Sequence, residues 1–418
     1  MSSPKLQAPR GTFDVLPDDA ERRAGIEAAA RRILGAAGYR RIETPAFEAT
    51  ELFKRTVGEA TDIVSKEMYT FEDGSGRSLT LRPEGTAPVC RAYLEHGMQK
   101  LPQPVKLWYL SPFFRYERAQ SGRYRQFWQV GIEAIGSADP ALDAESILLL
   151  AELLEAVGVR DARLRLTSLG TPASRAQYRE ELQAYLRAHA DKLSDEVRAR
   201  IELNPLRAFD ADHPGTREVM QGAPRLLDRL GGEDAEHFAQ VRELLDAAAL
   251  TYEVDATLVR GLDYYTRTLY EFTSDALGAQ SGVAGGGRYD GLIEQLGGPA
   301  TPSVGWAAGV ERMLLASGEQ PAGAPVVDLF VGYPGEPASR AVAFKIAREA
   351  RQAGLAAHLE LAGRSLKGQH KQAARVGARF VAIADAQQVA LRDHETGAEQ
   401  TVAPDGVVAA VLRGRRAS

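Results

Sequence analysis

The chain has 418 residues, of which 44% are hydrophobic and 26% charged, and its formal net charge is −5. A chain of this length is expected to fold as two or three domains. The composition excludes several classes of protein. A single cysteine, Cys90, allows no internal disulfide framework, the seven histidines show no zinc-site spacing, and no apolar run reaches the length of a membrane helix. The start "MSSPKLQAPRG" lacks the apolar centre of a signal peptide, so we expect a cytoplasmic protein without membrane contact.

Helix and strand patterns divide most of the chain. Apolar residues at helical spacing predict a helix from Asp18 to Gly38, with Asp18 or Asp19 as the N-cap. Strands are predicted at 78–82, 104–117, 126–135 and 162–168, and an apolar helix at 140–157. Residues of about 171–250 have a mainly helical pattern, and strand patterns return from about 251. We therefore expect a helical insertion between two halves of one sheet domain.

The last quarter of the chain has a different pattern. The composition of "SGEQPAGAP", residues 317–325, predicts a linker, after which strands and helices alternate as in a small α/β domain with a largely parallel sheet. The expected domains are thus 1–325, interrupted at about 171–250, and 326–418. The second domain holds 13 Lys and Arg against 9 Asp and Glu. This mild excess suits a polyanion partner, although a solvated surface would have the same composition.

Residues 113–135 read as two strands joined by an arginine-rich loop. The alternation of side chains in a strand places one set of residues toward the core and another on a polar face. The core set is Trp128, Val130, Ile132 and Ala134, and the polar set is Phe127, Gln129, Gly131 and Glu133. Arg115 and Glu117 share a face of the first strand. Guanidinium groups beside an aromatic ring suit an anionic nucleotide, whereas the alternative is a solvated outer face of an antiparallel sheet.

Four further segments carry polar residues where core residues would be expected. "LTLRPEGTAPV" places Arg82, Glu84 and Thr86 at alternate positions before a helix. "AGGGRYDGL" has three adjacent glycines, which allow either close approach to a ligand or a tight turn, followed by Arg288 and Tyr289. "VGWAAGVERM" puts Arg312 near the expected start of a helix, where an anion is favoured. "LVRGLDYYTRT", residues 258–268, reads as a strand with Arg260 beside two tyrosines.

Together these segments resemble the class II aminoacyl-tRNA synthetases, and most closely the histidine-specific family. The first motif of that class matches "GYRRIETPAFE", residues 38–48. The second motif matches Arg115, Glu117, Arg123 and Phe127, and the third matches Gly305, Gly309, Glu311 and Arg312. "LVRGLDYYT", "AGGGRYDGL" and "NPLR" at 204–207 match features of the histidine-specific family.

The resemblance covers essentially the whole chain and implies a fold, a reaction and its partners. The implied fold is α/β: an α+β catalytic domain with an antiparallel sheet flanked by helices, a helical insertion and a C-terminal α/β anticodon-binding domain. The implied reaction is ATP-dependent activation of L-histidine to histidyl-adenylate, followed by transfer to the 3′ end of tRNA(His), with AMP and diphosphate as products. Mg²⁺ is expected to enter with ATP, with no metal held by the protein alone. The first motif implies a homodimer.

Roles for individual residues also follow from the resemblance. Arg260 and Arg115 are implied as catalytic groups on opposite sides of the α-phosphate. The implied ATP contacts are Arg115, Glu117, Arg123, Phe127 and Arg312. The implied histidine contacts are Glu84, Gly85, Thr86, Gln129, Glu133, Tyr264, Tyr265 and Tyr289. Asp263 is expected to orient its neighbours.

Contacts to tRNA are expected in two places. Arg118 and Gln120 in the loop at 118–125 would meet the acceptor end, although Ser121 stands where relatives often have Lys. Lys367, Lys371, Arg375 and Arg379 recur every four residues and would form a basic stripe on a helix. The alternative for this stripe is a solvated helix face.

Two other functions compete with the synthetase reaction. One is a non-catalytic, synthetase-like regulatory subunit of ATP phosphoribosyltransferase, and the other is an RNA-binding or sensor module. Retention of Arg115, Arg260 and Arg312 disfavours both. Among the remaining residues, Cys90 is expected to pack in the core, and His96, His237 and His370 are expected at the surface or in satisfied hydrogen bonds.

Overall fold

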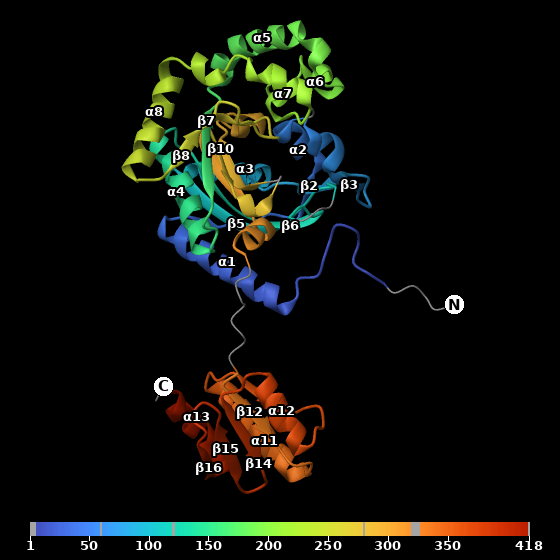
Figure 1. The fold of residues 1–418 in the computed structure, drawn as a ribbon, viewed down its shortest axis with the longest axis vertical. Coiled ribbons are helices and arrows are strands. Elements are labelled where there is room, and N and C mark those ends of the chain that lie inside the picture. The colour runs from blue at the N-terminus through green and yellow to red at the C-terminus, as the bar shows by residue number, and fades with distance from the viewer. Residues whose placement is uncertain (1–5, 59–60, 119–121, 279–280, 319–326, 417–418) are drawn as a thin grey trace, which may run out of the picture. The chain divides into compact units, whose positions relative to one another are not determined.

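The computed structural model describes residues 6–58, 61–118, 122–278, 281–318 and 327–416. The chain divides into two compact units, Met1–Gln320 and Pro321–Ser418, each of which Figure 1 shows with its own sheet. None of the helices within the described ranges is long and apolar enough to cross a membrane.

The first unit is built on an eight-stranded sheet. Its strands, in spatial order, are β1 (Arg40–Arg41), β5 (Val105–Phe114), β6 (Gln126–Ile135), β11 (Ser303–Gly309), β10 (Gly282–Arg288), β9 (Thr266–Thr273), β7 (Arg163–Ser168) and β8 (Tyr252–Val254). The six central strands are antiparallel, and only the short edge strands β1 and β8 run parallel to their neighbours. The expected antiparallel sheet is confirmed.

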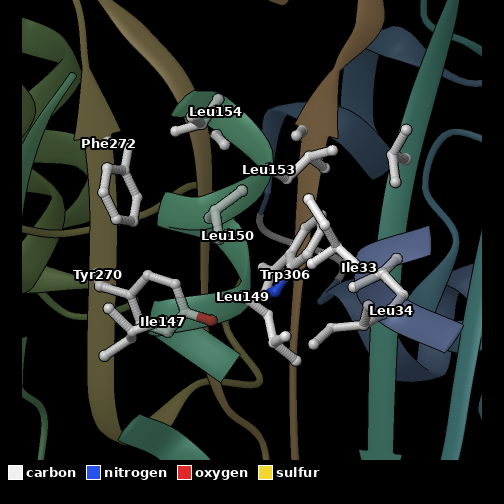
Figure 2. Close-up of a cluster of buried hydrophobic side chains, with 14 of the residues drawn as sticks. Ile33, Leu34, Ile147, Leu149, Leu150, Leu153, Leu154, Tyr270, Phe272 and Trp306 are labelled. Atoms are coloured by element: carbon white, nitrogen blue, oxygen red, sulfur yellow. The ribbon is translucent and has the colours of Figure 1, made fainter. Parts of the chain in front are cut away.

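One face of this sheet is covered by α1 (Pro17–Ala36), α4 (Pro140–Ala156) and α8 (Gly232–Ala247). Figure 2 shows the contact: Leu150 and Leu153 of α4 lie against Phe272 of β9 and Trp306 of β11. Helix α4 is rich in apolar residues, which it buries against the sheet and the neighbouring helices. Asp139 caps its start, with Oδ1 accepting from the Ala141 N–H at 2.9 Å. Burial of each such leucine contributes about 1.5–3 kcal/mol.

Helix α1 begins one residue earlier than the sequence predicts. Its N-cap is Leu16, which offers no side-chain hydrogen bond, so neither Asp18 nor Asp19 is the cap. Pro17 occupies the first helical position, where its fixed φ and missing N–H cost nothing, and the two aspartates lie in the first turn, where the helix dipole favours them.

The other face of the sheet packs on α3 (Thr86–Glu95) and α9 (Leu292–Gln295), beside a small sheet and α2 (Thr50–Val57). The small sheet has the order β2 (Phe47–Ala49), β4 (Ser78–Leu81), β3 (Tyr69–Glu72). Helix α10 (Val310–Ala316) follows β11 directly. The predicted polar face of β6 is not a solvated outer surface, because Gly131 and Glu133 are buried and Phe127 and Gln129 are half-buried.

The insertion joins β7 to β8, which are neighbours at one edge of the sheet. It contains α5 (Pro172–Ala188), α6 (Asp195–Arg200), a 3₁₀ turn at Pro205–Asp210, α7 (Pro214–Gln221) and α8. Figure 1 shows α5, α6 and α7 gathered at one end of the sheet. Side chains of Thr171 and Ser194 cap α5 and α6, as the sequence pattern of small hydroxyl residues before each helix requires.

The second unit has five strands in the order β13 (Ala357–Leu359), β12 (Leu329–Gly332), β14 (Phe380–Ala384), β15 (Val389–Asp393) and β16 (Glu399–Val402). Its helices are α11 (Pro337–Gln352), α12 (Leu366–Arg375) and α13 (Val407–Arg416). The expected largely parallel sheet is wrong in part, because β14, β15 and β16 pair antiparallel. Short turns join β14 to β15 and β15 to β16, and only an antiparallel arrangement permits such short connections.

Candidate active site

A cavity of about 490 Å³ lies over the large sheet in the first unit. Its wall gathers six residues from three separate parts of the chain: Arg115, Glu117, Arg123, Phe127, Arg260 and Arg312. These are all of the residues that the sequence implies for ATP contact and catalysis. They come from the β5–β6 hairpin, the connection before β9, and α10.

The hairpin side of the cavity holds its charges in a fixed arrangement. The Nε of Arg115 donates to the Pro83 carbonyl at 2.8 Å, and its guanidinium carbon lies 5.4 Å from the centre of the Phe127 ring. Glu117 lies 3.7 Å from Arg115 and 3.3 Å from Arg123, measured between the nearest oxygen and nitrogen atoms. The aromatic face can stack on a flat ring, and the two guanidinium groups can bind anionic oxygens. This side of the cavity therefore suits a ligand that carries both.

Arg312 enters the cavity from the start of α10, as the sequence predicts. Its Nε donates to the Gly282 carbonyl, and its Nη1 lies 3.4 Å from the Gly122 carbonyl. Burial, together with the nearby Arg123 cation, lowers the pKa of the Arg312 guanidinium. The preceding residue, Glu311, fixes the helix: its carboxylate accepts from the Trp128 N–H at 3.0 Å and from Arg23 at 2.6 Å.

Arg260 does not lie on a strand, so the prediction of a strand at 258–268 is wrong for most of that segment. Residues 255–265 form an irregular connection, and β9 begins only at Thr266. The physical reason is visible in Tyr264 and Tyr265, whose rings lie 4.8 Å apart in the same buried cluster. Adjacent residues of a strand would point to opposite faces.

The guanidinium of Arg260 is paired and closely surrounded. Its Nη1 donates to Glu271 Oε1, and Arg165 lies 3.5 Å from the other Glu271 oxygen. Burial alone would lower the pKa of Arg260, but the charge of Glu271 together with Tyr265, Tyr264 and Asp210 outweighs it, so that the pKa is raised. A Cβ on Gly285 would lie 2.8 Å from Arg260 Nη2. The first glycine of the triple run therefore makes room for a side chain, and the run lies in strand β10 rather than in a tight turn.

Beside the cavity, buried polar side chains gather around Glu133, and we call this group the Glu133 pocket. Its Oε1 accepts from the Thr86 hydroxyl at 2.8 Å and from the Tyr109 hydroxyl at 3.4 Å, and its Oε2 accepts from Tyr289. Glu133 is 1% exposed, and burial raises its pKa to about 8. A Cβ on Gly131 would overlap the Tyr109 ring, so this glycine is needed for the pocket to form.

Glu84 and Gly85 close the same pocket at the start of α3. The Glu84 carboxylate accepts from the Thr86 N–H at 2.7 Å and from the Ala87 N–H at 3.0 Å, and burial raises its pKa. A Cβ on Gly85 would lie 2.5 Å from the Tyr109 ring. Gln129 lies on the wall shared with the first cavity, and its buried Oε1 has no hydrogen-bond partner among the described residues. A buried acceptor of this kind suits a ligand that brings a donor.

Tyr264 and Tyr265 complete the pocket. Both are buried, and the Tyr264 ring lies 5.8 Å from the ring of Tyr289. Burial raises the pKa of the Tyr265 hydroxyl to about 12, although the Arg260 cation opposes the rise. The residues implied for histidine contact thus lie around Glu133 or, in the case of Gln129, on the wall of the first cavity.

Comparisons with known proteins agree with this geometry. The family model described as "Histidyl-tRNA synthetase" matches residues 11–313, and that described as "Anticodon binding domain" matches residues 328–413. The histidine–tRNA ligase of Desulforudis audaxviator (strain MP104C) is 48% identical over 98% of this chain and 99% of its own length.

The chain belongs to the histidyl-tRNA synthetase family. Its fold is that of a solved S. aureus histidyl-tRNA synthetase without ligand, with a TM-score of 0.82 at 36% identity over 97% of this chain and 100% of the other. A structure titled as an ATP phosphoribosyltransferase regulatory subunit/histidyl-tRNA synthetase from Bacillus halodurans is also similar, with a TM-score of 0.64 at 22% identity over 89% of this chain and 97% of that one. At that identity the likeness shows the fold alone.

Two arginines in the family motifs have structural roles instead of lining the pocket. Arg288 is fully buried, and its Nε lies 3.1 Å from both carboxylate oxygens of Asp143. Arg82 donates to the Pro112 carbonyl at 2.9 Å and to the Thr44 carbonyl at 2.6 Å. Removal of either partner of a buried pair such as Arg288 and Asp143 would leave an uncompensated charge.

The predicted tRNA contacts of this synthetase-family chain are exposed where they can be described. Arg118 is exposed, whereas Gln120 and Ser121 lie outside the described residues. Lys367, Lys371 and Arg375 are exposed on α12. Arg379 is not part of their stripe, because α12 ends at Arg375 and the Arg379 guanidinium donates to the Gly414 carbonyl at 2.8 Å.

Sequence reasoning missed two residues of the site and misjudged a third elsewhere. Glu271 and Tyr109 each lie on a mainly apolar strand, so the pattern around them predicts core residues. The one sequence signal is for Glu271, which is a charged residue within the otherwise uncharged segment "TLYEFT". Cys90 is buried in α3 as expected, with a raised thiol pKa because of burial. His237 is neither at the surface nor satisfied: it is 5% exposed, and neither ring nitrogen has a hydrogen-bond partner among the described residues.

Proposed function

We propose that this protein activates L-histidine with ATP in the two adjoining pockets and then transfers the histidine to tRNA(His). As a member of the histidyl-tRNA synthetase family it is a histidine–tRNA ligase, and AMP and diphosphate are the products of that reaction. The observation that carries the site assignment is the convergence of Arg115, Arg260 and Arg312 on one cavity beside the Glu133 pocket.

ATP would occupy the larger cavity. In this proposal Phe127 stacks on the adenine and Glu117 accepts from its amino group, while Arg115 and Arg260 hold the α-phosphate from opposite sides. Arg123 and Arg312 then contact the outer phosphates. The histidine carboxylate is itself the nucleophile, so the reaction needs no general base. It needs the repulsion between two anions to be cancelled and the charge on the pentavalent phosphorus to be stabilised, and the two arginines supply both effects.

Histidine would occupy the pocket around Glu133. Its neutral imidazole has one N–H donor and one nitrogen acceptor, which Glu133 and Tyr265 can match, with Tyr264 and Tyr289 packed around the ring. Its ammonium group would lie near Glu84, Gly85, Thr86 and the unpartnered Gln129 oxygen. A site that satisfies both ring nitrogens rejects apolar side chains of similar size by a factor of about 10⁴.

Mg²⁺ would enter with ATP, where it neutralises the diphosphate leaving group. The described residues contain no cluster of three or more His, Cys, Asp or Glu that could bind a metal ion. The cavity wall nevertheless includes the carboxylates of Glu271 and Asp210, which are ligands of the hard type that Mg²⁺ accepts. These two residues are the ones that could assist the phosphates in holding it.

The remaining partners follow from the family. The tRNA acceptor end would approach the hairpin loop that includes Arg118 and Gln120, and the anticodon would meet the second unit, with Lys367, Lys371 and Arg375 on phosphates. A homodimer through residues 38–48, and a location in the cytoplasm with the tRNA, complete the proposal.

The regulatory subunit of ATP phosphoribosyltransferase remains the second candidate. It is the weaker one, because the three cavity arginines are retained and a basic anticodon-type domain is present.

Histidine-dependent exchange of radiolabelled diphosphate into ATP tests the proposal. Folded protein with Mg²⁺ should catalyse exchange with histidine and not with the other amino acids, and it should charge tRNA(His). Absence of exchange under these conditions would refute the enzyme assignment. Exchange driven by another amino acid would refute the histidine specificity alone.

A further inference from the structure

The connection that carries Arg260 has little backbone support. It runs from Asp255 to Tyr265 between β8 and β9, outside any strand or helix. Within the described chain, the N–H and C=O groups of residues 259–262 make no backbone–backbone hydrogen bond. The position of the Arg260 side chain must therefore be fixed by contacts from side chains.

Glu271 holds the guanidinium of Arg260 itself, and the connection that carries Arg260 is anchored at Asp263. Its Oδ1 accepts from the Nδ2 of Asn204 at 2.8 Å, and Asn204 belongs to the insertion. Its backbone N–H lies 3.5 Å from the Val57 carbonyl at the end of α2. A Cβ on Gly58 would lie 2.9 Å from Asp263 Oδ2, so the carboxylate fits closely against α2.

Arg207, three residues after Asn204, lies near the connection at Gly261, the residue directly after Arg260. Its Nη1 donates to Asp210 Oδ2 at 2.9 Å, and a Cβ on Gly261 would lie 3.7 Å from the same nitrogen. Its Nη2 lies 3.7 Å from Asp62, whose carboxylate also accepts from Arg200 at 2.9 Å. The insertion thus contacts the residues that follow Arg260 and the segment after α2 at the same time.

We infer that Asn204 and Arg207 are positioning residues that hold the 255–265 connection so that Arg260 stays in the ATP cavity. The inference rests on the proposed role of Arg260 in adenylate formation. Asp210, the partner of Arg207, lines that cavity together with Arg260. Adenylate formation is therefore coupled to the seating of the insertion, although neither Asn204 nor Arg207 contacts the reacting atoms.

Asn204→Ala removes the hydrogen bond to Asp263 and leaves the cavity residues in place. The turnover number in diphosphate exchange should fall about tenfold, while the KM for histidine changes less than about twofold, since Tyr264 and Tyr265 are held separately by their packing in the buried cluster that contains Tyr289. The matched control is Arg229→Ala, which breaks an exposed ion pair with Glu181 elsewhere on the insertion. It should leave both kinetic constants unchanged.

An exchange of donor and acceptor separates positioning from loss of stability. Asn204→Asp alone sets two carboxylates against each other and should lower the turnover number by about 100-fold. Combined with Asp263→Asn, the pair regains one amide and one carboxylate, and the turnover number should recover to within about threefold of the wild type.

The outcomes are distinguishable. Wild-type turnover in the Asn204→Ala and Asn204→Asp variants, or a double variant no faster than Asn204→Asp, would overturn the inference while the proposed function stands. So would a fall in thermal stability with turnover of the folded fraction unchanged. No histidine-dependent exchange by the wild type would remove the proposed function, and the inference with it.

Discussion

At the scale of single residues, the site is a set of charges whose partners are already in place. Arg260 is paired with Glu271, Glu117 lies between two arginines, and Glu133 accepts from hydroxyl groups of three residues. Preorganised groups of this kind need little rearrangement when charge develops during a reaction. Electrostatic stabilisation by such groups is usually the largest single contribution to catalysis. Substitution of one of them should therefore alter the chemistry more than the fold.

Arg260→Gln should lower the turnover number in diphosphate exchange by more than about 100-fold, because a charged donor to the α-phosphate is lost. Histidine affinity, measured by calorimetry without ATP, should change by less than about threefold. The matched control is Arg163→Gln, whose ion pair with Asp275 is exposed. A large loss of histidine affinity with unchanged turnover would show that Arg260 belongs to the amino-acid pocket instead.

The raised pKa of Glu133 leads us to expect that the protein releases a proton when histidine binds. With a pKa of about 8, most of the ligand-free protein carries this carboxyl protonated at pH 7. Acceptance of an imidazole N–H favours the ionised form, so binding at pH 7 should release close to one proton, and affinity should rise between pH 7 and pH 8. Calorimetry in two buffers with different ionisation enthalpies measures the release. Glu133→Gln should abolish it, and an unchanged release in that variant would contradict the assignment.

The same residue affects stability in the ligand-free protein. The folded-state pKa lies above the ordinary value, so the native state binds more protons than the unfolded state between about pH 4.5 and 8. The contribution is complete at low pH and is lost as the pH rises through about 8. Urea unfolding across this range should therefore show a decline that Glu133→Gln removes.

At the scale of elements, the glycine-rich strand β10 allows the sheet and the cavity proposed for ATP to coexist. Gly285 leaves room for Arg260, and Gly286 lies against the neighbouring strand, where a Cβ would come within 2.5 Å of Trp306 Cβ. A strand with three glycines has low intrinsic stability, and its neighbours β9 and β11 hold it.

Gly286→Ala should destabilise the first unit by at least about 2 kcal/mol, because β10 and β11 must separate to accept the methyl group. Urea unfolding followed by tryptophan fluorescence reports on this unit, since Trp108, Trp128 and Trp306 all lie in its sheet. Gly291→Ala is the control, as no atom lies within 4 Å of its added Cβ. Equal stability of the two variants would show that the sheet relaxes around the methyl group.

Elements with a strong local pattern could be predicted, whereas those set by distant contacts could not. The helix at 140–157 and the strand at 126–135 match α4 and β6 because their apolar residues repeat regularly. The aromatic composition of residues 258–268 predicts a strand, although tertiary packing brings the rings of both tyrosines into the same buried cluster. The site residues were implied by motif likeness, but their pairing with Glu271 and Tyr109 depends on strands far apart in the sequence.

At the scale of the whole molecule, two units divide the work that the family reaction requires. The arginines and the histidine pocket lie in the first unit, and the α12 stripe of Lys367, Lys371 and Arg375 lies in the second. Under the proposed function, the amino-acid activation step would need only the first unit, whereas transfer would use contacts of tRNA with both units.

Lys367→Glu combined with Lys371→Glu should raise the KM for tRNA in aminoacylation by about tenfold or more, through lost phosphate contacts, and should weaken the salt dependence of binding. Diphosphate exchange without tRNA should be unchanged. Lys345→Glu combined with Arg348→Glu on α11 is a control of the same charge change in the same unit, at two exposed side chains. Equal effects of the two charge reversals would point to a general electrostatic attraction rather than to α12.

The pairing of β7 with β8 decides how the insertion can be shortened. The two strands are parallel, with Leu164 opposite Tyr252, so the chain that leaves β7 must travel back along the sheet before β8 begins. Helix α8, packed on α4, makes that crossover. Helix α8 is therefore needed for the sheet edge to close, whereas α5, α6 and α7 are not needed to return the chain to β8 and serve instead to pack against the core that contains Tyr264 and Tyr265.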